Sequence, residues 1–351
     1  MFSTYKPEDV TILLKDITGL VDPLPTKDRE RLIQGGVHYS EMLPKEYQPS
    51  PAYLNAYYKA VSLYSLQTAK AVASVAAQIR RNKSREIVLV SLARAGTPIG
   101  ILLKRYLEKA QNFPVRHYTI SIIRGKGIDE NAMNYILARH SPESIQFVDG
   151  WTGKGAIQNQ LNLALIKYPD VNPALAVLSD PANVAGIAGT HTDFLIPSSL
   201  LNSTVSGLLS RTFHRSDIIG PNDFHGAAFY EELLDQDCTY HFIESVECKF
   251  DFSMPVDYEE NASQSRSGLA EVRRIANSFS IDDINLIKPS IGEATRVLLR
   301  RLPWKILVHS LDDKEYLGHL YQLASEKKVA VEVYPLENYR ACGIIKKLPD
   351  M

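Results

Sequence analysis

The chain has 351 residues, which is enough for two domains, one of them large enough for a full α/β core. Its 39 basic and 40 acidic residues leave a formal net charge of −1. The overall charge therefore does not predict a nucleic-acid partner, but it does not exclude a local basic patch. Three cysteines without a CxxC spacing indicate a reducing cytoplasm rather than a disulfide framework. We expect a soluble, cytoplasmic protein with no membrane partner, because residues 1–30 lack an apolar leader core and no apolar run would span a bilayer.

Residues 1–51 are predicted to be irregular, since prolines and Gly35-Gly36 interrupt every longer run. The polar and aromatic cluster His38-Tyr39-Ser40-Glu41 fits either a surface wrap or a flap over a site, and the residues alone favour the wrap. Residues 53–81 form a predicted long helix, whose near-continuous apolar face implies burial against a sheet.

Apolar runs at residues 86–92, 115–123, 145–148, 175–178 and 194–196 are predicted strands, and helices are predicted at 99–110, 132–139 and 157–168. The run Ile87-Val88-Leu89-Val90 has no polar alternation, which is typical of a parallel sheet covered on both faces. Alternating strands and helices predict an α/β fold with an open, doubly wound, mainly parallel sheet.

Three polar or glycine-rich loops follow predicted strands, at residues 93–97, 124–131 and 149–155. Sheets of this kind bind ligands beyond the carboxyl ends of their strands, so we expect the three loops to converge on one site. The third loop is Asp149-Gly150-Trp151-Thr152-Gly153-Lys154-Gly155. Its backbone amides and the following helix N-terminus suit a phosphate, and Asp149 suits sugar hydroxyls.

Two other interpretations of this loop were weighed. A tight strand-to-helix turn would need the glycines only for its backbone. A nucleotide-binding P-loop is excluded, because Gly155 follows Lys154 where that motif needs Ser or Thr, and Val148 stands where it needs its first Gly.

A family resemblance runs through residues 38–41, 91–96, 148–155 and the C-terminal segment, and so covers nearly the whole chain. The loops resemble those of type I phosphoribosyltransferases. The whole chain resembles the fusion of such a domain with a Pelota domain, found in bacterial tellurite-resistance and stress gene clusters. Some members of that family are labelled cysteine proteases of the StiP type. The resemblance implies a phosphoribosyltransferase fold with a helical N-terminal region and a hood in residues 1–280, and a small α/β Pelota-like RNA-binding domain in residues 281–351.

The resemblance also implies a reaction, the Mg²⁺-dependent transfer of 5-phosphoribose from phosphoribosyl pyrophosphate to a small nucleobase-like acceptor. Arg94, Ala95 and Gly96 would match the pyrophosphate loop, and residues 150–155 the ribose-phosphate loop. Asp149 would hold the ribose and the metal, while Arg124 and Lys126 close over the pyrophosphate as a catalytic lid.

The chain departs from the enzyme pattern at the start of the ribose-phosphate loop. Gly150 follows Asp149 where a second acidic residue is usual, and the loop is shorter. Contacts to the ribose and the metal would then need Asp180, Asp193 or Glu41.

Residues 198–235 are rich in hydroxyl groups, arginine and histidine. In the superfamily that the chain resembles, such an insertion forms a hood that selects the acceptor, so Arg211, His214 and His225 are the acceptor-site candidates. Cysteine-protease chemistry is disfavoured, because acids surround Cys238, and Cys248 lies in a run at 242–250 that alternates like a strand.

The C-terminal part begins with a predicted polar linker at residues 259–267. Helices are predicted at 291–301 and 316–326, and strands at 305–308 and 329–334. The helix start at Gly292-Glu293 and a predicted turn at Cys342-Gly343 carry the Pelota resemblance. Glu293, Arg296 and Arg300 are the RNA-binding candidates, against the alternative of a domain kept for packing or dimerisation.

The leading hypothesis is a phosphoribosyltransferase with an RNA-binding module that acts in a tellurite or stress response. The second is a non-catalytic sensor that binds ribose phosphate and reports it through the RNA module. The third is base exchange or ribosylation on RNA itself. The identity of the acceptor stays open, as does a homodimer, which is usual in the superfamily.

Overall fold

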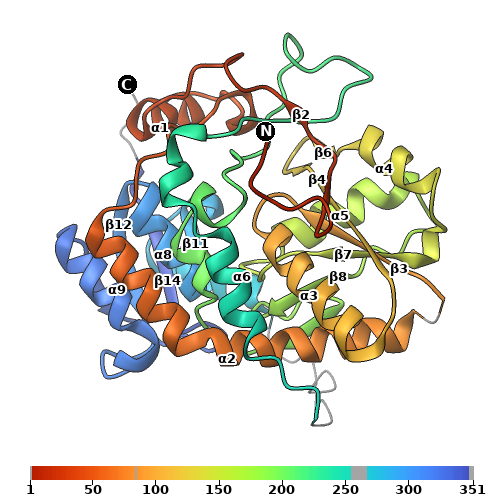
Figure 1. Ribbon diagram of the computed structural model, residues 1–351. Helices are drawn as coiled ribbons and strands as arrows, with labels where there is room; N and C mark the ends of the chain where they lie inside the picture. The colour runs from red at the N-terminus through yellow and green to blue at the C-terminus, as the bar shows by residue number, and fades with distance from the viewer. Residues whose placement is uncertain (1, 84, 254–266, 348–351) are drawn as a thin grey trace.

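The computed structural model describes residues 2–83, 85–253 and 267–347 (Figure 1). Its main sheet has six parallel strands in the order β1-β4-β3-β7-β8-β9. These strands are β1 (Thr11–Ile12), β3 (Ile87–Leu92), β4 (Val115–Ile120), β7 (Ile145–Val148), β8 (Leu175–Ser179) and β9 (Ile187–Thr190). The prediction of an α/β fold with a mainly parallel sheet is confirmed.

Helices cover both faces of this sheet, which explains why its strands lack polar alternation. Ile87 and Leu89 of β3 pack in the layer of α2 (Pro51–Asn82), α3 (Gly96–Gln111) and α6 (Thr239–Glu247). Val88 and Val90 point to the other face, in the layer of α4 (Glu130–Leu137) and α5 (Ala156–Ala164). α2 begins at Pro51, two residues before its predicted start, because Ser50 caps its first turn by accepting a hydrogen bond from the backbone of Tyr53.

Two segments far apart in the sequence wrap around the sheet together. β2 (Lys15–Asp16) of the N-terminal region pairs with β10 (Gly226–Ala227) of the segment after β9. α1 (Thr26–Gln34) lies in the N-terminal region too, so the prediction that residues 1–51 are irregular is wrong in part. Between β4 and α4, β5 (Ile122–Ile123) and β6 (Gly127–Ile128) form a small hairpin.

The C-terminal part builds a second sheet of four strands in the order β11-β14-β12-β13. These are β11 (Ile287–Pro289), β12 (Pro303–Val308), β13 (Ala330–Val333) and β14 (Ala341–Ile345). α7 (Gly268–Ser278), α8 (Ile291–Arg300) and α9 (Lys314–Glu326) pack on it. Ser290 caps α8 by accepting a hydrogen bond from the backbone N–H of Glu293.

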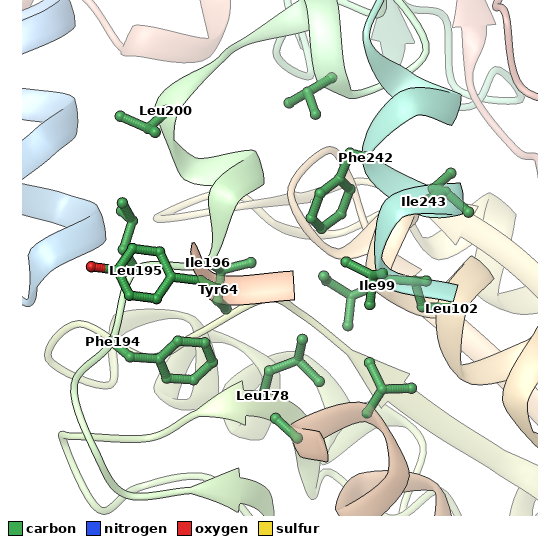
Figure 2. Close-up of a cluster of buried hydrophobic side chains, with 14 of the residues drawn as sticks. Tyr64, Ile99, Leu102, Leu178, Phe194, Leu195, Ile196, Leu200, Phe242 and Ile243 are labelled. Atoms are coloured by element: carbon green, nitrogen blue, oxygen red, sulfur yellow. The ribbon is translucent and has the colours of Figure 1, made fainter. Parts of the chain in front are cut away.

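The two sheets are joined through a continuous hydrophobic core that reaches from Leu89 of β3 to Leu317 of α9. α2 runs beneath both parts (Figure 1), and Tyr64 of α2 donates a hydrogen bond to the backbone carbonyl of Glu315. Figure 2 shows Phe194 and Leu195, which follow β9, beside Tyr64 in this core.

Three local predictions are wrong. Residues 194–196 are buried but lie after the last strand, β9, and lead into a short 3-10 helix at Pro197–Leu200. The run at 242–250 is mostly the helix α6, with Phe242, Ile243 and Val246 buried along one face. Cys342-Gly343 lies inside β14 rather than in a turn.

The predicted linker at residues 259–267 lies, apart from Ser267, outside the described residues. In the part of the chain that the structure describes, no helix is both long and apolar enough to cross a membrane.

Candidate functional site

A cleft of about 1430 Å³ opens where the carboxyl ends of β3 and β7 face the C-terminal sheet. Eleven Lys or Arg residues and four Asp or Glu residues line it, although the chain has a formal net charge of −1. The positive charge of the molecule is therefore concentrated here. The cations are Arg29, Arg31, Lys45, Arg94, Arg124, Lys154, Arg211, Lys288, Arg296, Arg301 and Lys347, and the acids are Glu46, Asp149, Asp283 and Glu293.

The loop at 149–155 lies in this cleft, but several of its backbone amides are already used. The N–H of Asp149 donates to the carbonyl of Ala176 at 3.0 Å, and that of Thr152 donates to Ser179 at 2.9 Å. The N–H of Gly150 donates to the carboxylate of Asp149 at 2.8 Å. These three amides hold the loop on β8 and on itself instead of pointing at a ligand.

The same loop supports the C-terminal domain. The guanidinium of Arg296 lies 4.5 Å from the ring centre of Trp151, and Tyr339 donates a hydrogen bond to the carbonyl of Gly153 at 2.7 Å. Lys154 Nζ donates to the carbonyl of Ile287 at 3.2 Å. The loop thus serves as a docking surface between the two sheets, and its role in binding phosphate stays a prediction.

Charged side chains of this loop are strongly affected by burial. Burial raises the pKa of Asp149 to about 6, against the smaller lowering effects of the Gly150 amide and of Arg296. Burial, together with the charges of Lys288 and Arg124, lowers the pKa of Lys154 to about 7. Both groups are therefore poised to titrate near neutral pH.

The carboxylates proposed to replace the missing second acid have other partners in the structure. Asp180 accepts hydrogen bonds from the Thr152 hydroxyl at 2.5 Å and from two backbone amides. Asp193 accepts the backbone N–H of Ile291 at 3.1 Å and of Arg340 at 3.0 Å. Glu41 pairs with Lys126. Asp193 in this way joins the main domain to the C-terminal one.

The loop at 93–97 brings Arg94, Ala95 and Gly96 to the cleft wall or its edge. Arg94 donates to the carbonyl of Leu209 and to Asn202 Oδ1, both at 2.7 Å, and pairs with Glu46 at 3.1 Å. A Cβ on Gly96 would lie 2.4 Å from the carbonyl oxygen of Val148, so only glycine lets this loop approach β7 so closely.

Arg124 and Lys126 lie at the β5–β6 hairpin, held by the N-terminal region. His38 Nε2 lies 3.0 Å from the carbonyl oxygen of Arg124, and the N–H of Arg124 donates to Tyr39 Oη at 2.8 Å. Lys126 pairs with Glu41 at 2.7 Å. The cluster at 38–41 therefore contacts the predicted lid directly.

The acceptor-site candidates separate into two places. Arg211 lines the cleft with its guanidinium 4.3 Å from the ring centre of Tyr39. His214 and His225 form a ring pair 4.7 Å apart behind the hairpin, and His225 Nδ1 lies 2.9 Å from the Ser121 hydroxyl. Burial lowers the pKa of His225 to about 3, so this ring is neutral at physiological pH.

Of the RNA-binding candidates, Glu293 and Arg296 line the cleft and pair with each other at 3.2 Å. Arg300 is the last residue of α8, and its side chain lies outside the described part of the chain. These three roles stay predictions.

Asp149 is the candidate ligand for Mg²⁺ in the cleft. Asp149 faces Arg296 and Glu293, and the described residues contain no group of three or more His, Cys, Asp or Glu side chains placed to hold a metal ion. The expected Mg²⁺ stays untested, and no step below depends on it.

A second group of reactive side chains lies away from the cleft, at the start of α6. Cys238 is the buried N-cap residue of this helix, and His241 follows in its first turn with an exposed ring. Tyr57 Oη lies 3.0 Å from His241 Nδ1 and 3.5 Å from the Cys238 carbonyl oxygen. Tyr58 packs edge-on against the His241 ring with ring centres 5.1 Å apart.

This group was not predicted from the sequence, where the acids beside Cys238 disfavour a reactive thiol. The spacing of a cysteine and a histidine three residues apart at a helix start was the available signal. Tyr57 and Tyr58 come from α2, and Tyr57 precedes His241 by 184 residues, so their contribution needed the fold.

Comparisons with known proteins match nearly the whole chain. A family model described as "Tellurite-like stress resistance cysteine protease StiP" matches residues 3–247, and one described as "PELOTA RNA binding domain" matches residues 266–347. A protein of Acinetobacter baylyi named "Cysteine protease StiP" is 36% identical over 364 residues, covering 98% of this chain and 94% of its own length.

Solved structures give a much weaker likeness. A hypoxanthine phosphoribosyltransferase from Trypanosoma cruzi is 19% identical, with a TM-score of 0.28, over 36% of this chain and 72% of its own. A hypoxanthine-guanine phosphoribosyltransferase from Bacillus anthracis is 20% identical, with a TM-score of 0.26, over 36% of this chain and 76% of its own. Scores this low carry no argument about the reaction.

The prediction that the chain is a phosphoribosyltransferase is therefore corrected. The family model and the Acinetobacter protein, which match most of the chain, both bear the name of a cysteine protease, the alternative that the sequence analysis disfavoured. Binding of phosphoribosyl pyrophosphate, expected as the substrate of that reaction or as the ligand of a non-catalytic sensor, stays a prediction. By its matches over residues 3–247 and over 98% of its length, the chain belongs to the StiP family of tellurite-like stress resistance proteins.

Proposed function

We propose that the chain is a cysteine protease whose nucleophile is the thiol of Cys238. One observation carries this assignment. Cys238 is the sole cysteine within residues 3–247, the part matched by the StiP model, because Cys248 and Cys342 follow it in the sequence. It also occupies the N-cap position of α6, where the helix dipole favours a thiolate although the side chain makes no capping hydrogen bond, and it lies in the same turn as His241.

The hydrogen bonds around His241 suit a general base. Tyr57 Oη can donate its proton to the Cys238 carbonyl and accept the N–H of His241 Nδ1. In this tautomer His241 Nε2 carries the free lone pair, and Tyr57 orients the ring as the third member of a catalytic triad does.

The proposed reaction has two steps. His241 takes the Cys238 proton, and the thiolate attacks the carbonyl carbon of a peptide bond. A thioester forms, and the amine leaves with the proton from His241. Water then hydrolyses the thioester to a carboxylate and restores the thiol.

The thiol is not activated in the structure as it stands. Burial raises the pKa of Cys238 and the charge of Asp237 raises it further, while a hydrogen bond with Tyr58 lowers it. The active thiolate is therefore scarce at neutral pH, and we expect the rate of hydrolysis to rise steadily from pH 7 to pH 9.

Hydrolysis of fluorescently labelled casein tests the proposal. We expect the purified full chain to cleave casein, and Cys238→Ala and His241→Ala to lose the activity with unchanged circular dichroism. Cys248→Ala, which removes the exposed cysteine ten residues away, is the matched control and should keep full activity. Equal cleavage by the wild type and Cys238→Ala would refute the assignment.

A second candidate function is RNA binding by the cleft. It is supported by the excess of cations over acids in the lining and by the match of residues 266–347 to a Pelota RNA-binding domain. Affinity for a single-stranded RNA should fall steeply between 50 and 200 mM salt, by about 10²-fold or more if several phosphates are contacted. An affinity that does not change with salt would contradict phosphate contacts.

A further inference from the structure

Four arginines meet at one end of the cleft, and each comes from a different segment. Arg29 lies on α1, Arg94 in the loop at 93–97, Arg211 in the segment after β9, and Arg301 directly after α8. Their charges act on each other, because Arg29, Arg94 and Arg301 all lower the pKa of Arg211. We call these four residues the arginine cluster.

Two members of the arginine cluster have carboxylate partners. Arg94 pairs with Glu46 at 3.1 Å, and its remaining donors go to Asn202 and Leu209. Arg301 Nη2 pairs with Glu30 at 3.0 Å, and the Glu30 side chain is almost fully buried. These two guanidinium groups are therefore neutralised by the protein itself.

Arg29 and Arg211 have no such partner among the described residues. Arg29 Nε is buried without a hydrogen-bond partner among the described residues, and the guanidinium of Arg211 lies over the Tyr39 ring, 4.3 Å from its centre. Burial, together with the neighbouring arginines, lowers the pKa of Arg211 to about 9 and also lowers the pKa of Arg29. Both side chains are half-buried in the cleft wall, and neither forms an ion pair with a described carboxylate, so their positive charges are available to an anion that enters the cleft.

We propose that Arg29 and Arg211 bind a phosphate dianion at this end of the cleft, with Arg301 beside them. Four guanidinium groups against two carboxylates leave an excess of two positive charges, and a phosphate monoester or inorganic phosphate carries nearly two negative charges at pH 7. The planar guanidinium matches two phosphate oxygens at once, which a lysine would not.

The position of the arginine cluster links the two matched parts of the chain. Arg29 and Arg211 belong to the StiP-matched residues, and Arg301 to the Pelota-matched residues. A bound dianion therefore touches both. Two sources offer this chemistry: free phosphate in the cell, and the terminal phosphate of an RNA strand lying in the cleft. The second source depends on the RNA binding proposed above.

Titration calorimetry with inorganic phosphate at pH 7.5 and constant ionic strength tests the site. We expect the wild type to bind one phosphate, and Arg211→Gln to weaken binding by about tenfold or more, as expected for losing a charge-assisted hydrogen bond. The control Arg116→Gln removes an exposed arginine of β4 outside the cleft and should bind as the wild type does. Arg211→Gln relieves repulsion, so it should fold, and Arg29→Gln provides an independent second variant.

Two RNA oligonucleotides of one sequence, with a 5′-phosphate or a 5′-hydroxyl, separate the sources. Tighter binding of the phosphorylated strand, lost in Arg211→Gln, identifies the RNA end as the ligand. If inorganic phosphate binds and the protein has equal affinity for the two RNA strands, the free anion is the ligand. The proposal is overturned if inorganic phosphate does not bind and each RNA strand binds Arg211→Gln and Arg29→Gln with the same affinity as the wild type. Salt-dependent binding of the 5′-hydroxyl strand tests the RNA function separately.

Discussion

Replacing Asp149 by asparagine should stabilise the protein at neutral pH and leave its stability almost unchanged in acid. The Asp149 carboxylate lies at the end of β7, with the N–H of Gly150 as its hydrogen-bond donor at 2.8 Å. Burial raises its pKa to about 6. In the unfolded chain an aspartate has a pKa of about 3.9, so the folded protein binds this proton more tightly.

The sign and size of the effect follow from this difference. The stability contributed by Asp149 is fully present below about pH 4, is lost as the pH rises towards 6, and stays lost above it. A difference of about two pKa units corresponds to at most about 3 kcal/mol. Because the side chain lines an open cleft, screening reduces this to about 1–2 kcal/mol. Asparagine has the same shape and no charge, so Asp149→Asn should avoid the loss.

Urea unfolding at pH 4.5, 6 and 7.5 measures the effect, with tryptophan fluorescence as the probe because Trp151 lies two residues away. The free energy of unfolding of Asp149→Asn should exceed that of the wild type by an amount that increases with pH. Asp170→Asn, at an exposed position, is the matched control and should follow the wild type at each pH. A difference between Asp149→Asn and the wild type that does not change with pH, or a variant less stable at pH 7.5, would refute the reasoning.

Three further predictions concern the joint between the domains and the proposed active site. Asp193→Ala leaves the buried amides of Ile291 and Arg340 without an acceptor. It should lower the free energy of unfolding in urea by about 2–4 kcal/mol. An unchanged unfolding midpoint would show that this contact between the domains does not contribute to stability. Gly343→Ala places a Cβ 2.9 Å from Val297 Cγ2. It should lower the free energy of unfolding by about 1–3 kcal/mol, measured as a lower midpoint of thermal unfolding. A midpoint equal to that of the wild type would mean that α8 moves to make room for the Cβ. Tyr57→Phe removes the hydrogen bond to His241 and should lower the rate of casein cleavage roughly tenfold while the fold is kept, and an unaltered rate would exclude Tyr57 from orienting the ring.

The sheet was predictable wherever a strand is mostly apolar. β3 and β7 are such strands because helices cover both faces, and their polar residues Ser91 and Gln146 are buried with hydrogen-bond partners. β9 (Ile187–Thr190) escaped prediction because it is short and holds a glycine and a threonine. The apolar run at 194–196 was mistaken for a strand because its side chains enter the core shared with α9, which is burial without sheet pairing.

Two other differences between the predicted and the observed elements concern Gly343 and the helix α6. Gly343 was read as a turn signal, but it lies in β14, where the close approach of α8 leaves no room for a Cβ. The run at 242–250 was read as a strand because Phe242, Val246, Cys248 and Phe250 lie at even spacings, whereas the buried positions Phe242, Ile243 and Val246 follow the helical period of α6.

The candidate site could be predicted only in part. Arg94 and Lys154 reach one cleft because they follow strands of one parallel sheet, and Arg124 reaches it from the β5–β6 hairpin that comes after β4. The docking of the 149–155 loop on the C-terminal domain could not be foreseen, since it depends on contacts such as Tyr339 to Gly153 between residues far apart in the chain. The surroundings of Cys238 could not be foreseen either, because Tyr57, which lies 3.0 Å from His241 Nδ1, comes from α2.

Trapping the catalytic thiol is the most direct test of the proposed function. The full chain is incubated with a peptidyl acyloxymethyl ketone, which alkylates a cysteine when a neighbouring base has activated it, and the modified residue is identified by mass spectrometry. The account predicts modification of Cys238, blocked in His241→Ala, with no adduct on the exposed Cys248. Modification of Cys248 alone, or of Cys238 at the same rate in His241→Ala, would contradict it.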